Sequence, residues 1–180
     1  MLKNPSIFRQ NNNLQSTMSD IIHGFKPVFD SNSELLVLGS FPSVKSRAID
    51  FYYGNRQNRF WKMLYGYFGE TLHEGVEAKK DFVLCRHVAL WDVITSCEIV
   101  GSSDANIENY TVADIRSVVQ AAPIRMILLN GAAAYKIFSE NFGGIGVPYL
   151  RMPSTSPANP RYEQGVWHAA LDSVFKPAKQ

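Results

Sequence analysis

The amino-acid sequence predicts an α/β fold, a three-layer α/β/α sandwich whose central sheet is four-stranded and mainly parallel. Its apolar segments are short and continuous, which is typical of strands that are covered on both faces. Segments with helical spacing of apolar residues alternate with these strands along the chain, as they do in α/β folds. A length of 180 residues suits one domain with a full hydrophobic core.

The predicted buried strands are residues 35–38, 88–93, 126–129 and 148–152. Helical patterns cover residues 58–68, 111–121, 131–142 and 162–175. The second helix is expected to begin at a capping box formed by Thr111 and Asp114. The third is expected to end before Gly143 and Gly144, which suit a helix end. The first and last helices are expected to bury Trp61, Leu64, Phe68, Val166, Ala170, Leu171 and Val174.

Composition narrows the class of protein. The net charge of +2 and the pI of about 8.5 are too mild to indicate a nucleic-acid partner by themselves. Two cysteines are too few for a four-thiolate metal site, and they suit a reducing compartment. No apolar run reaches membrane-spanning length, so we expect a cytoplasmic protein. We also expect the protein to be a monomer. Residues 1–20 are rich in Asn, Gln and Ser, which predicts a disordered extension before a single domain over residues 21–180.

Polar or aromatic residues stand at the end of every predicted strand. Trp91 and Asp92 follow Leu90 near the end of the second strand, Asn130 follows the third, and a Ser/Thr/Pro/Asn-rich segment at 153–160 follows the fourth. Ligand sites in such sheets form outside the carboxyl ends of the strands. These segments should therefore converge on one cleft, where an ionised Asp92 would accept a ring N–H and Asn130 could both donate and accept.

The segment 39–61, which follows the first strand, is unusual for a loop because it contains six aromatic residues and four cations. The rings of Phe41 and Tyr53 offer flat faces on which a nucleobase could stack. The four cations of this loop, Lys45, Arg47, Arg56 and Arg59, carry charge suited to phosphate groups. Ser154, Thr155 and Ser156 have hydroxyl and backbone N–H groups that bind phosphate oxygens. The structural alternatives are that the other aromatics are core anchors, and that Asn55, Asn58, Asp92 and Asn130 only make turns and caps.

Two long motifs resemble the uracil-DNA glycosylase superfamily. Residues 39–43 (Gly-Ser-Phe-Pro-Ser), followed by 52–55 (Tyr-Tyr-Gly-Asn) and 58–61 (Asn-Arg-Phe-Trp), resemble its first motif and are spaced as in the mismatch-specific branch. Residues 152–159 resemble the second motif, a loop that enters the minor groove. Shorter matches at 89–93, 101–104 and 129–131 make the pattern most similar to the hypoxanthine-DNA glycosylase branch.

The resemblance implies a DNA repair enzyme that flips a deaminated base out of the helix and hydrolyses its N-glycosidic bond, with hypoxanthine as the expected base. Phe41 stands where mismatch-specific relatives carry a catalytic Asn. By residue matching, the catalytic amide would instead be Asn58, with Asn55 as second choice. Tyr53 and Phe41 would stack on the base, and Asp92 and Asn130 would read its edge. The residues expected to contact the DNA backbone are Ser43, Lys45, Arg47, Ser154, Thr155, Ser156 and Asn159.

No metal or other cofactor is needed for this chemistry, and no lysine stands at a predicted strand end, so a monofunctional glycosylase is expected. One alternative is the same fold and chemistry acting on uracil in mismatches. Another is a non-catalytic nucleic-acid-binding member, because the usual acid or amide of the first motif is missing. The position of Asn58 distinguishes an enzyme from a non-catalytic binding protein, since only an enzyme needs the Asn58 amide in the pocket with Tyr53.

Overall fold

The computed structural model describes residues 20–99 and 107–176. At its centre is a four-stranded sheet in the order β3-β2-β6-β7, and all of its neighbouring strands are parallel. The strands are β2 (Leu35–Gly39), β3 (Val88–Asp92), β6 (Met126–Asn130) and β7 (Tyr149–Met152). The predicted four-stranded parallel sheet is confirmed, and Asp92 and Asn130 are the last residues of their strands. The predicted burial of its fourth strand is wrong, because β7 lies at the edge of the sheet and exposes Leu150 and Arg151.

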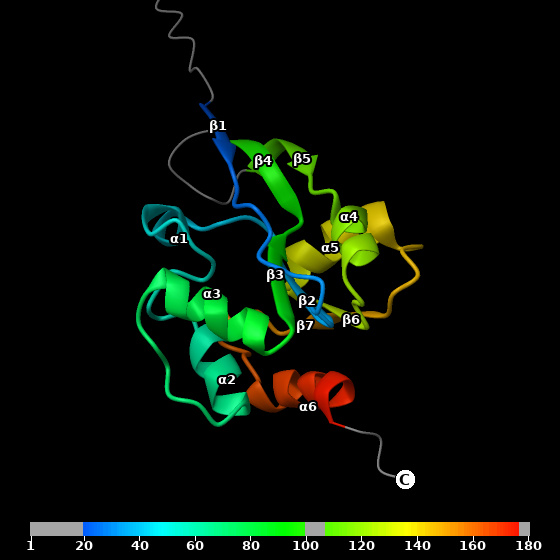
Figure 1. Cartoon of the computed structure of the whole chain (residues 1–180). Coiled ribbons are helices and arrows are strands. Elements are labelled where there is room, and N and C mark those ends of the chain that lie inside the picture. Colours follow the sequence, from blue (N-terminus) through cyan, green and yellow to red (C-terminus); the bar gives the residue numbers. More distant parts are fainter. Residues whose placement is uncertain (1–19, 100–106, 177–180) are drawn as a thin grey trace, which may run out of the picture.

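Helices cover both faces of this sheet (Figure 1). On one face lie α4 (Ile115–Ala121) and α5 (Ala132–Phe142), and on the other lie α2 (Phe60–Tyr67), α3 (Val76–Cys85) and α6 (Gln164–Phe175). A short helix, α1 (Val44–Ala48), stands in the loop after β2. The predicted α/β/α sandwich is therefore confirmed.

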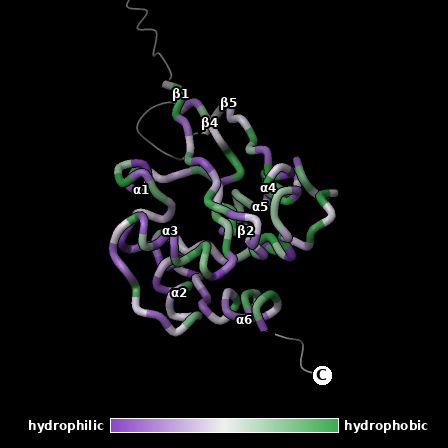
Figure 2. The backbone as a smooth tube through the Cα atoms, viewed as in Figure 1, coloured by the Kyte–Doolittle hydropathy of each residue, from purple (hydrophilic) through white to green (hydrophobic). Residues whose placement is uncertain are grey.

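The core lies between these layers. Strands β2 and β3 are buried along their whole length, and hydrophobic segments gather around them in Figure 2. Phe60, Phe138 and Trp167 bring large, fully buried side chains from helices on both faces. Burying a side chain of this size contributes roughly 1.5–3 kcal/mol to the stability of the fold. In the described part of the chain, no helix is both long and apolar enough to cross a membrane.

Two details of the helix predictions are wrong. Thr111 belongs to β5 (Ile107–Val112), where it pairs with Ser96, and Asp114 caps α4 by accepting a hydrogen bond from the Ser117 backbone N–H. Strand pairing thus overrides the capping-box pattern. Val166 is 41% exposed, and the neighbouring Trp167 is fully buried instead. The Trp167 Nε1–H donates to the Pro153 carbonyl at 2.9 Å, which sets which face of α6 points inward.

A second, antiparallel sheet is absent from the prediction. It contains β1 (Asp20–His23), β4 (Ile94–Ile99) and β5 in the order β1-β4-β5. Only Val93 separates β3 from β4, so the predicted strand 88–93 runs into the turn between them. Residues 1–19 of the predicted disordered extension, and the matching segment 101–104, lie outside the described residues. Residue 20, the last of that predicted extension, begins β1.

Candidate active site

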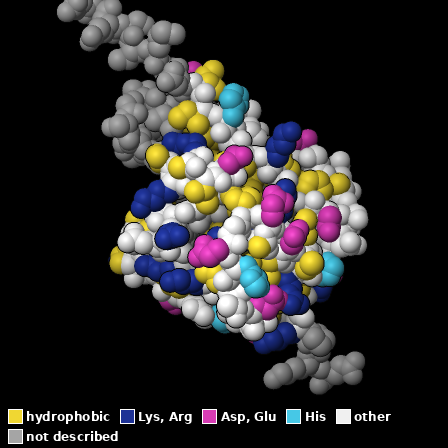
Figure 3. All heavy atoms as spheres, turned by 60° about the vertical axis from the view of Figure 1, so that its left-hand side comes forward, with side chains coloured by type: hydrophobic (Ala, Val, Ile, Leu, Met, Phe, Trp, Pro, Cys, Tyr) yellow, Lys and Arg dark blue, Asp and Glu magenta, His cyan; other side chains and the backbone are white. Residues whose placement is uncertain are grey.

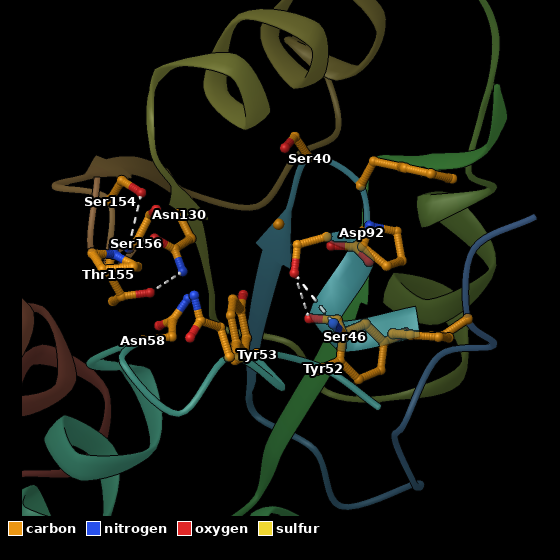
Figure 4. Close-up of a pocket in the computed structure, with 17 residues that line it drawn as sticks. Ser40, Ser46, Tyr52, Tyr53, Asn58, Asp92, Asn130, Ser154, Thr155 and Ser156 are labelled. Carbon is orange, nitrogen blue, oxygen red and sulfur yellow. Dashed lines mark hydrogen bonds between the residues drawn. The ribbon is translucent and has the colours of Figure 1, made fainter. Parts of the chain in front are cut away.

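A cavity of about 230 Å³ opens at the carboxyl edge of the parallel sheet (Figure 4). The chain leaves β2 toward one helical layer and leaves β6 toward the other, and these two strands are neighbours. A crevice forms where the connections diverge in this way. The predicted site residues that line it are Phe41, Ser43, Tyr53, Asn55, Asn58, Asp92, Asn130, Ser154, Thr155 and Ser156. Lys45, Arg47 and Asn159 do not line it.

Tyr53 forms one wall of the pocket. Its backbone φ of 53° lies in the left-handed region, which a bulky residue adopts only when surrounding packing holds it there. Its ring packs on Phe60, with centroids 4.0 Å apart. Its hydroxyl is buried without a hydrogen-bond partner among the described residues, although Asn130 lies nearby. Burial, followed by the charge of Asp92, raises the pKa of the Tyr53 phenol, which therefore stays protonated.

Asp92 lies deep in the pocket. Its side chain is almost fully buried, and its Oδ2 atom has no hydrogen-bond partner among the described residues. Strand pairing places it opposite Gly39, whose missing side chain leaves room for the carboxyl group. Loss of hydration raises the pKa of Asp92 to about 7. A carboxyl group in this position can therefore be neutral or ionised near neutral pH.

Asn130 connects β6 to the loop at 153–160. Its Nδ2–H donates to the Thr155 Oγ1 atom at 2.9 Å, and its Oδ1 atom accepts from the Thr155 backbone N–H at 2.9 Å. The next residue, Gly131, has a φ of 102°, and a Cβ there would lie 3.2 Å from Ser154 Cβ. Asn130 thus holds this loop against the sheet, while one amide hydrogen and one oxygen lone pair remain for a ligand.

Asn58 faces the same pocket as Tyr53, as the sequence-based test for an enzyme requires (Figure 4). Its Oδ1 atom accepts from the Phe60 backbone N–H at 3.0 Å, just before α2. This bond sets the orientation of the amide and leaves its NH₂ group unused within the turn. Asn55 also lines the pocket, and its Oδ1 atom accepts from the Gln57 backbone N–H at 3.1 Å.

Phe41 lies half-buried at the mouth of the pocket, and Ser43 begins the short helix beside it. The Arg47 guanidinium lies 5.8 Å from the Phe41 ring centroid and donates to the Pro42 carbonyl at 2.7 Å. Arg47 therefore supports the loop from within. Lys45, by contrast, is exposed to solvent.

Arg59 joins the two motif loops, a role that sequence reasoning missed. Its Nη1 atom donates to the carbonyls of Ser156 at 3.1 Å and Asn159 at 3.0 Å. Its backbone N–H donates to the Thr155 carbonyl at 3.0 Å, and its guanidinium lies 4.9 Å from the Tyr162 ring centroid. The only signal in the sequence was its place inside the Asn-Arg-Phe-Trp box.

Ser46 is a second residue that sequence reasoning missed. It is buried, its Oγ atom accepts from the Gly54 backbone N–H at 3.0 Å, and it also bonds the Ser43 Oγ atom at 3.1 Å. It thereby ties α1 to the turn that carries Tyr53. A lone serine within a charged stretch gives no signal of such a role. The Asn159 Nδ2–H similarly donates to the Ser154 carbonyl at 2.9 Å and closes the other loop.

The described residues contain no group of three or more His, Cys, Asp or Glu side chains suited to hold a metal ion. Nor does any described lysine line the pocket. What the pocket offers a ligand is a ring face, a buried carboxyl group, three amide side chains and a rim of serine hydroxyls. These groups suit a flat heterocycle with polar edges.

The fold and this pocket define an α/β protein with a pocket suited to a flat, polar ring at the carboxyl edge of its parallel sheet. Residues 26–171 match the family model of the uracil DNA glycosylase superfamily, and the chain belongs to this superfamily. The resemblance of its two motifs is thus confirmed.

Named relatives agree with this assignment. The chain is 34% identical over 156 residues to a hypoxanthine DNA glycosylase of Methanosarcina acetivorans, a match that covers 84% of this chain and 98% of that protein. It is 32% identical over 110 residues to a hypoxanthine DNA glycosylase of Methanosarcina barkeri, covering 60% and 70% of the two chains. The solution NMR structure of a candidate uracil DNA glycosylase from Methanosarcina acetivorans superposes with a TM-score of 0.76 and 31% identity, covering 86% of this chain and 99% of that chain.

Proposed function

We propose that the protein is a monofunctional DNA N-glycosylase that removes hypoxanthine from DNA and leaves an abasic site. The observation that carries this proposal is a single pocket that holds Tyr53, Asn58 and Asp92 together, in a chain that matches a hypoxanthine DNA glycosylase over nearly the whole length of that relative. One chain supplies the entire pocket, so we expect it to act as a monomer. Both of its cysteines are free, which suits the cytoplasm.

The base enters the pocket after rotating out of the duplex and stacks on Tyr53. Stacking of a base on an aromatic ring contributes about 1–3 kcal/mol and does not depend on which base it is. Phe41, whose ring lies at the mouth, makes a second apolar contact. The unpairing cost is lowest for a mismatched or damaged base, which is one source of selectivity.

Asp92 reads the edge of the base, with Asn130 beside it. Hypoxanthine has an N1–H donor next to its O6 acceptor, and either oxygen of Asp92 accepts from that N–H. Adenine has no hydrogen at N1, so an ionised Asp92 would be left without a hydrogen-bond partner, which would disfavour adenine binding by about 1–3 kcal/mol. The acid form of Asp92 also donates its O–H to O6, where negative charge accumulates as the base departs.

Asn58 holds the attacking water. Cleavage passes through an oxocarbenium-like sugar, as in other glycoside hydrolysis, so the water needs orientation more than deprotonation. The Asn58 oxygen already accepts one hydrogen bond from the Phe60 backbone and keeps one lone pair for a water. An amide is a weak base, and catalysis therefore depends on positioning and on stabilisation of the leaving base.

The loop at 153–160 contacts the DNA backbone beside the flipped nucleotide. The hydroxyls of Ser154 and Ser156 line the rim of the pocket and are available to phosphate oxygens, as is that of Ser43. Thr155 is fully buried and Asn159 bonds within its own loop, so both act by holding the loop in shape.

A single-turnover cleavage assay tests the proposal. Labelled duplexes carry one deoxyinosine or one deoxyuridine, and hot alkali reveals abasic sites. We expect cleavage at deoxyinosine, lowered by about 10²-fold or more in Asn58→Ala. Gln57→Ala, an exposed neighbour in the same turn, is the control and should retain activity within about twofold. Cleavage at deoxyuridine alone would show that the enzyme removes uracil and not hypoxanthine. DNA binding without any cleavage would indicate a non-catalytic protein.

A further inference from the structure

A second cavity, of about 290 Å³, lies behind the turn at residues 54–58. Tyr53, Asn55 and Asn58 line both this cavity and the base pocket. The turn is therefore a thin wall between the two. A nucleotide bound in the base pocket would have its neighbours along the strand close to this wall.

The second cavity differs from the base pocket in charge. Arg56, from the turn, Lys62, from α2, and Lys79, from α3, line it together with a single acid, Glu74. No described lysine or arginine lines the base pocket. The ion pairs found within the described residues involve none of these three cations. Positive charge is thus concentrated next to the base pocket and excluded from it.

The local structure keeps these cations in place at the cavity. Asn55 closes the turn with two hydrogen bonds, accepting from the Gln57 N–H through its side chain and from the Asn58 N–H at 2.7 Å through its carbonyl. This turn leaves Arg56 exposed. The Lys79 Nζ atom lies 5.5 Å from the Trp61 ring centroid, which holds it over the cavity floor. Several Lys and Arg side chains gather on the left of the face shown in Figure 3.

We propose that this second cavity binds backbone phosphates of the DNA strand that carries the flipped nucleotide, and that Arg56, Lys62 and Lys79 each contact one of them. This inference rests on the proposed function, because it needs a DNA strand that crosses the mouth of the base pocket. A flipped nucleotide keeps its flanking phosphates, and among the described residues no lysine or arginine lines the base pocket to neutralise them. Phosphate contacts fix the register of a protein on DNA and leave sequence reading to the pocket.

The two cavities would then have different roles. The base pocket, which holds Asn58 and Asp92, determines the rate of cleavage, and the second cavity determines how tightly DNA binds. Each neutralised phosphate releases counterions, so the logarithm of the binding constant falls with the logarithm of salt by about 0.9 per contact. Three contacts would account for a slope of roughly 2–3 in this region.

The experiment measures binding of a short, fluorescein-labelled undamaged duplex by anisotropy over a series of salt concentrations. The variants are Arg56→Gln, Lys62→Gln, Lys79→Gln and all three combined. Lys136→Gln, an exposed lysine on α5, is the matched control. The same proteins then cleave a deoxyinosine duplex under single-turnover conditions at saturating enzyme. Thermal melting checks that each variant is folded.

We expect each single variant to weaken binding by about 3- to 10-fold at low salt and to reduce the salt slope by about 0.9, with the cleavage rate at saturation within about twofold of wild type. Unchanged affinity and slope in the triple variant, or the same change in Lys136→Gln, would overturn the inference. A large loss of the saturated cleavage rate would also overturn it, because the cations would then act in the base pocket.

If the triple variant fails to fold, the Arg56→Gln variant alone tests the inference, since the Arg56 side chain is exposed at the tip of the turn. Undamaged DNA is the binding probe, so a wild type that binds but does not cleave deoxyinosine would reject the proposed function and leave this inference open to the same measurement.

Discussion

The carboxyl group of Asp92 occupies the space that a side chain on Gly39 would fill. These residues end neighbouring parallel strands and are paired in register, and a Cβ built on Gly39 would overlap Asp92 Oδ1. The same Cβ would lie 3.7 Å from the Tyr53 hydroxyl. The first motif therefore needs a glycine at its first position, because only glycine leaves room for a carboxyl group that lies more than fifty positions away in the chain.

Gly39→Ala should therefore reduce both stability and activity. Overpacking a tight site costs about 1–3 kcal/mol, and the displaced Asp92 would no longer meet the base. Thermal melting and single-turnover cleavage of deoxyinosine measure the two effects. The matched control is Gly66→Ala in α2, where a Cβ would meet nothing within 4 Å and should stabilise the helix by about 0.5–1 kcal/mol.

A double variant, Gly39→Ala with Asp92→Ala, separates the two explanations. Removing the Asp92 carboxyl should recover most of the stability lost in Gly39→Ala, without recovering activity. If stability is not recovered, the overlap of these two groups is not the cause of the loss.

Asp92→Asn should stabilise the protein most at high pH. The folded pKa of about 7 exceeds the usual aspartate pKa of 3.8, so the folded state holds this proton more tightly than the unfolded state does. The stability contributed by the neutral acid is complete below about pH 4 and is lost as the pH rises through about 7. Denaturant unfolding of both proteins between pH 5.5 and 8.5 should show the gap in unfolding free energy widening toward high pH, to on the order of 2–4 kcal/mol. A constant gap would contradict the raised pKa.

The cleavage rate at deoxyinosine should fall as the pH rises through about 7. The acid form of Asp92 donates to O6 of the departing base, whereas the ionised form places a second negative charge beside it. Asp92→Asn can still accept and donate, so its rate should vary less with pH, while Asp92→Ala should be slower at every pH. A wild-type rate that rises through pH 7 would show instead that the ionised carboxylate is the active form. Single-turnover rates at saturating enzyme remove pH effects on DNA binding.

Arg59→Lys should weaken the enzyme although it keeps the charge. A lysine ammonium cannot reproduce the planar guanidinium that bonds the Ser156 and Asn159 carbonyls and lies over Tyr162. We expect a loss of about 1–3 kcal/mol in unfolding free energy and weaker DNA binding, because the loop at 153–160 loses its anchor. Arg161→Lys, at an exposed position close to that loop, should behave like wild type. Equal effects of the two substitutions would exclude a specific role for Arg59.

Thr155→Val should separate the positioning role of Asn130 from its contact with the base. The substitution preserves shape and removes the hydroxyl that accepts from the Asn130 amide. The buried amide hydrogen then lacks its partner, at a cost of about 1–3 kcal/mol. If Asn130 serves mainly to hold the loop, Thr155→Val and Asn130→Ala should raise the apparent DNA dissociation constant to a similar degree. If Asn130 also contacts the base, only Asn130→Ala should lower the cleavage rate at saturation.

Local sequence predicts the central strands of the parallel sheet well because these strands are apolar on both faces. Leu35–Gly39 and Val88–Asp92 are buried throughout, and continuous apolar runs of this kind give an unambiguous signal. The antiparallel strands Ile94–Ile99 and Ile107–Val112 mix polar and apolar residues, and pairing with each other stabilises them more than their composition does. Thr111 therefore became part of a strand, although its local pattern resembles a helix cap.

For the site, the sequence determined which residues stand at the strand ends, since that follows from where each apolar run stops. Asp92 and Asn130 line one pocket for this reason, and Phe41, Tyr53 and Asn58 reach it from the loop that follows β2. The sequence by itself also determined the family, through two motifs whose spacing is long and specific.

Only the tertiary structure decided what each of these groups does. It turned Arg47 and Arg59 inward onto carbonyl groups, left Arg56 exposed at a second cavity, and joined Asn130 to Thr155. It also buried Asp92 against Gly39, which raises the pKa of its carboxyl group. The physical reason is that hydrogen-bond partners and loss of hydration depend on neighbours brought from distant parts of the chain. Local sequence carries no record of those neighbours.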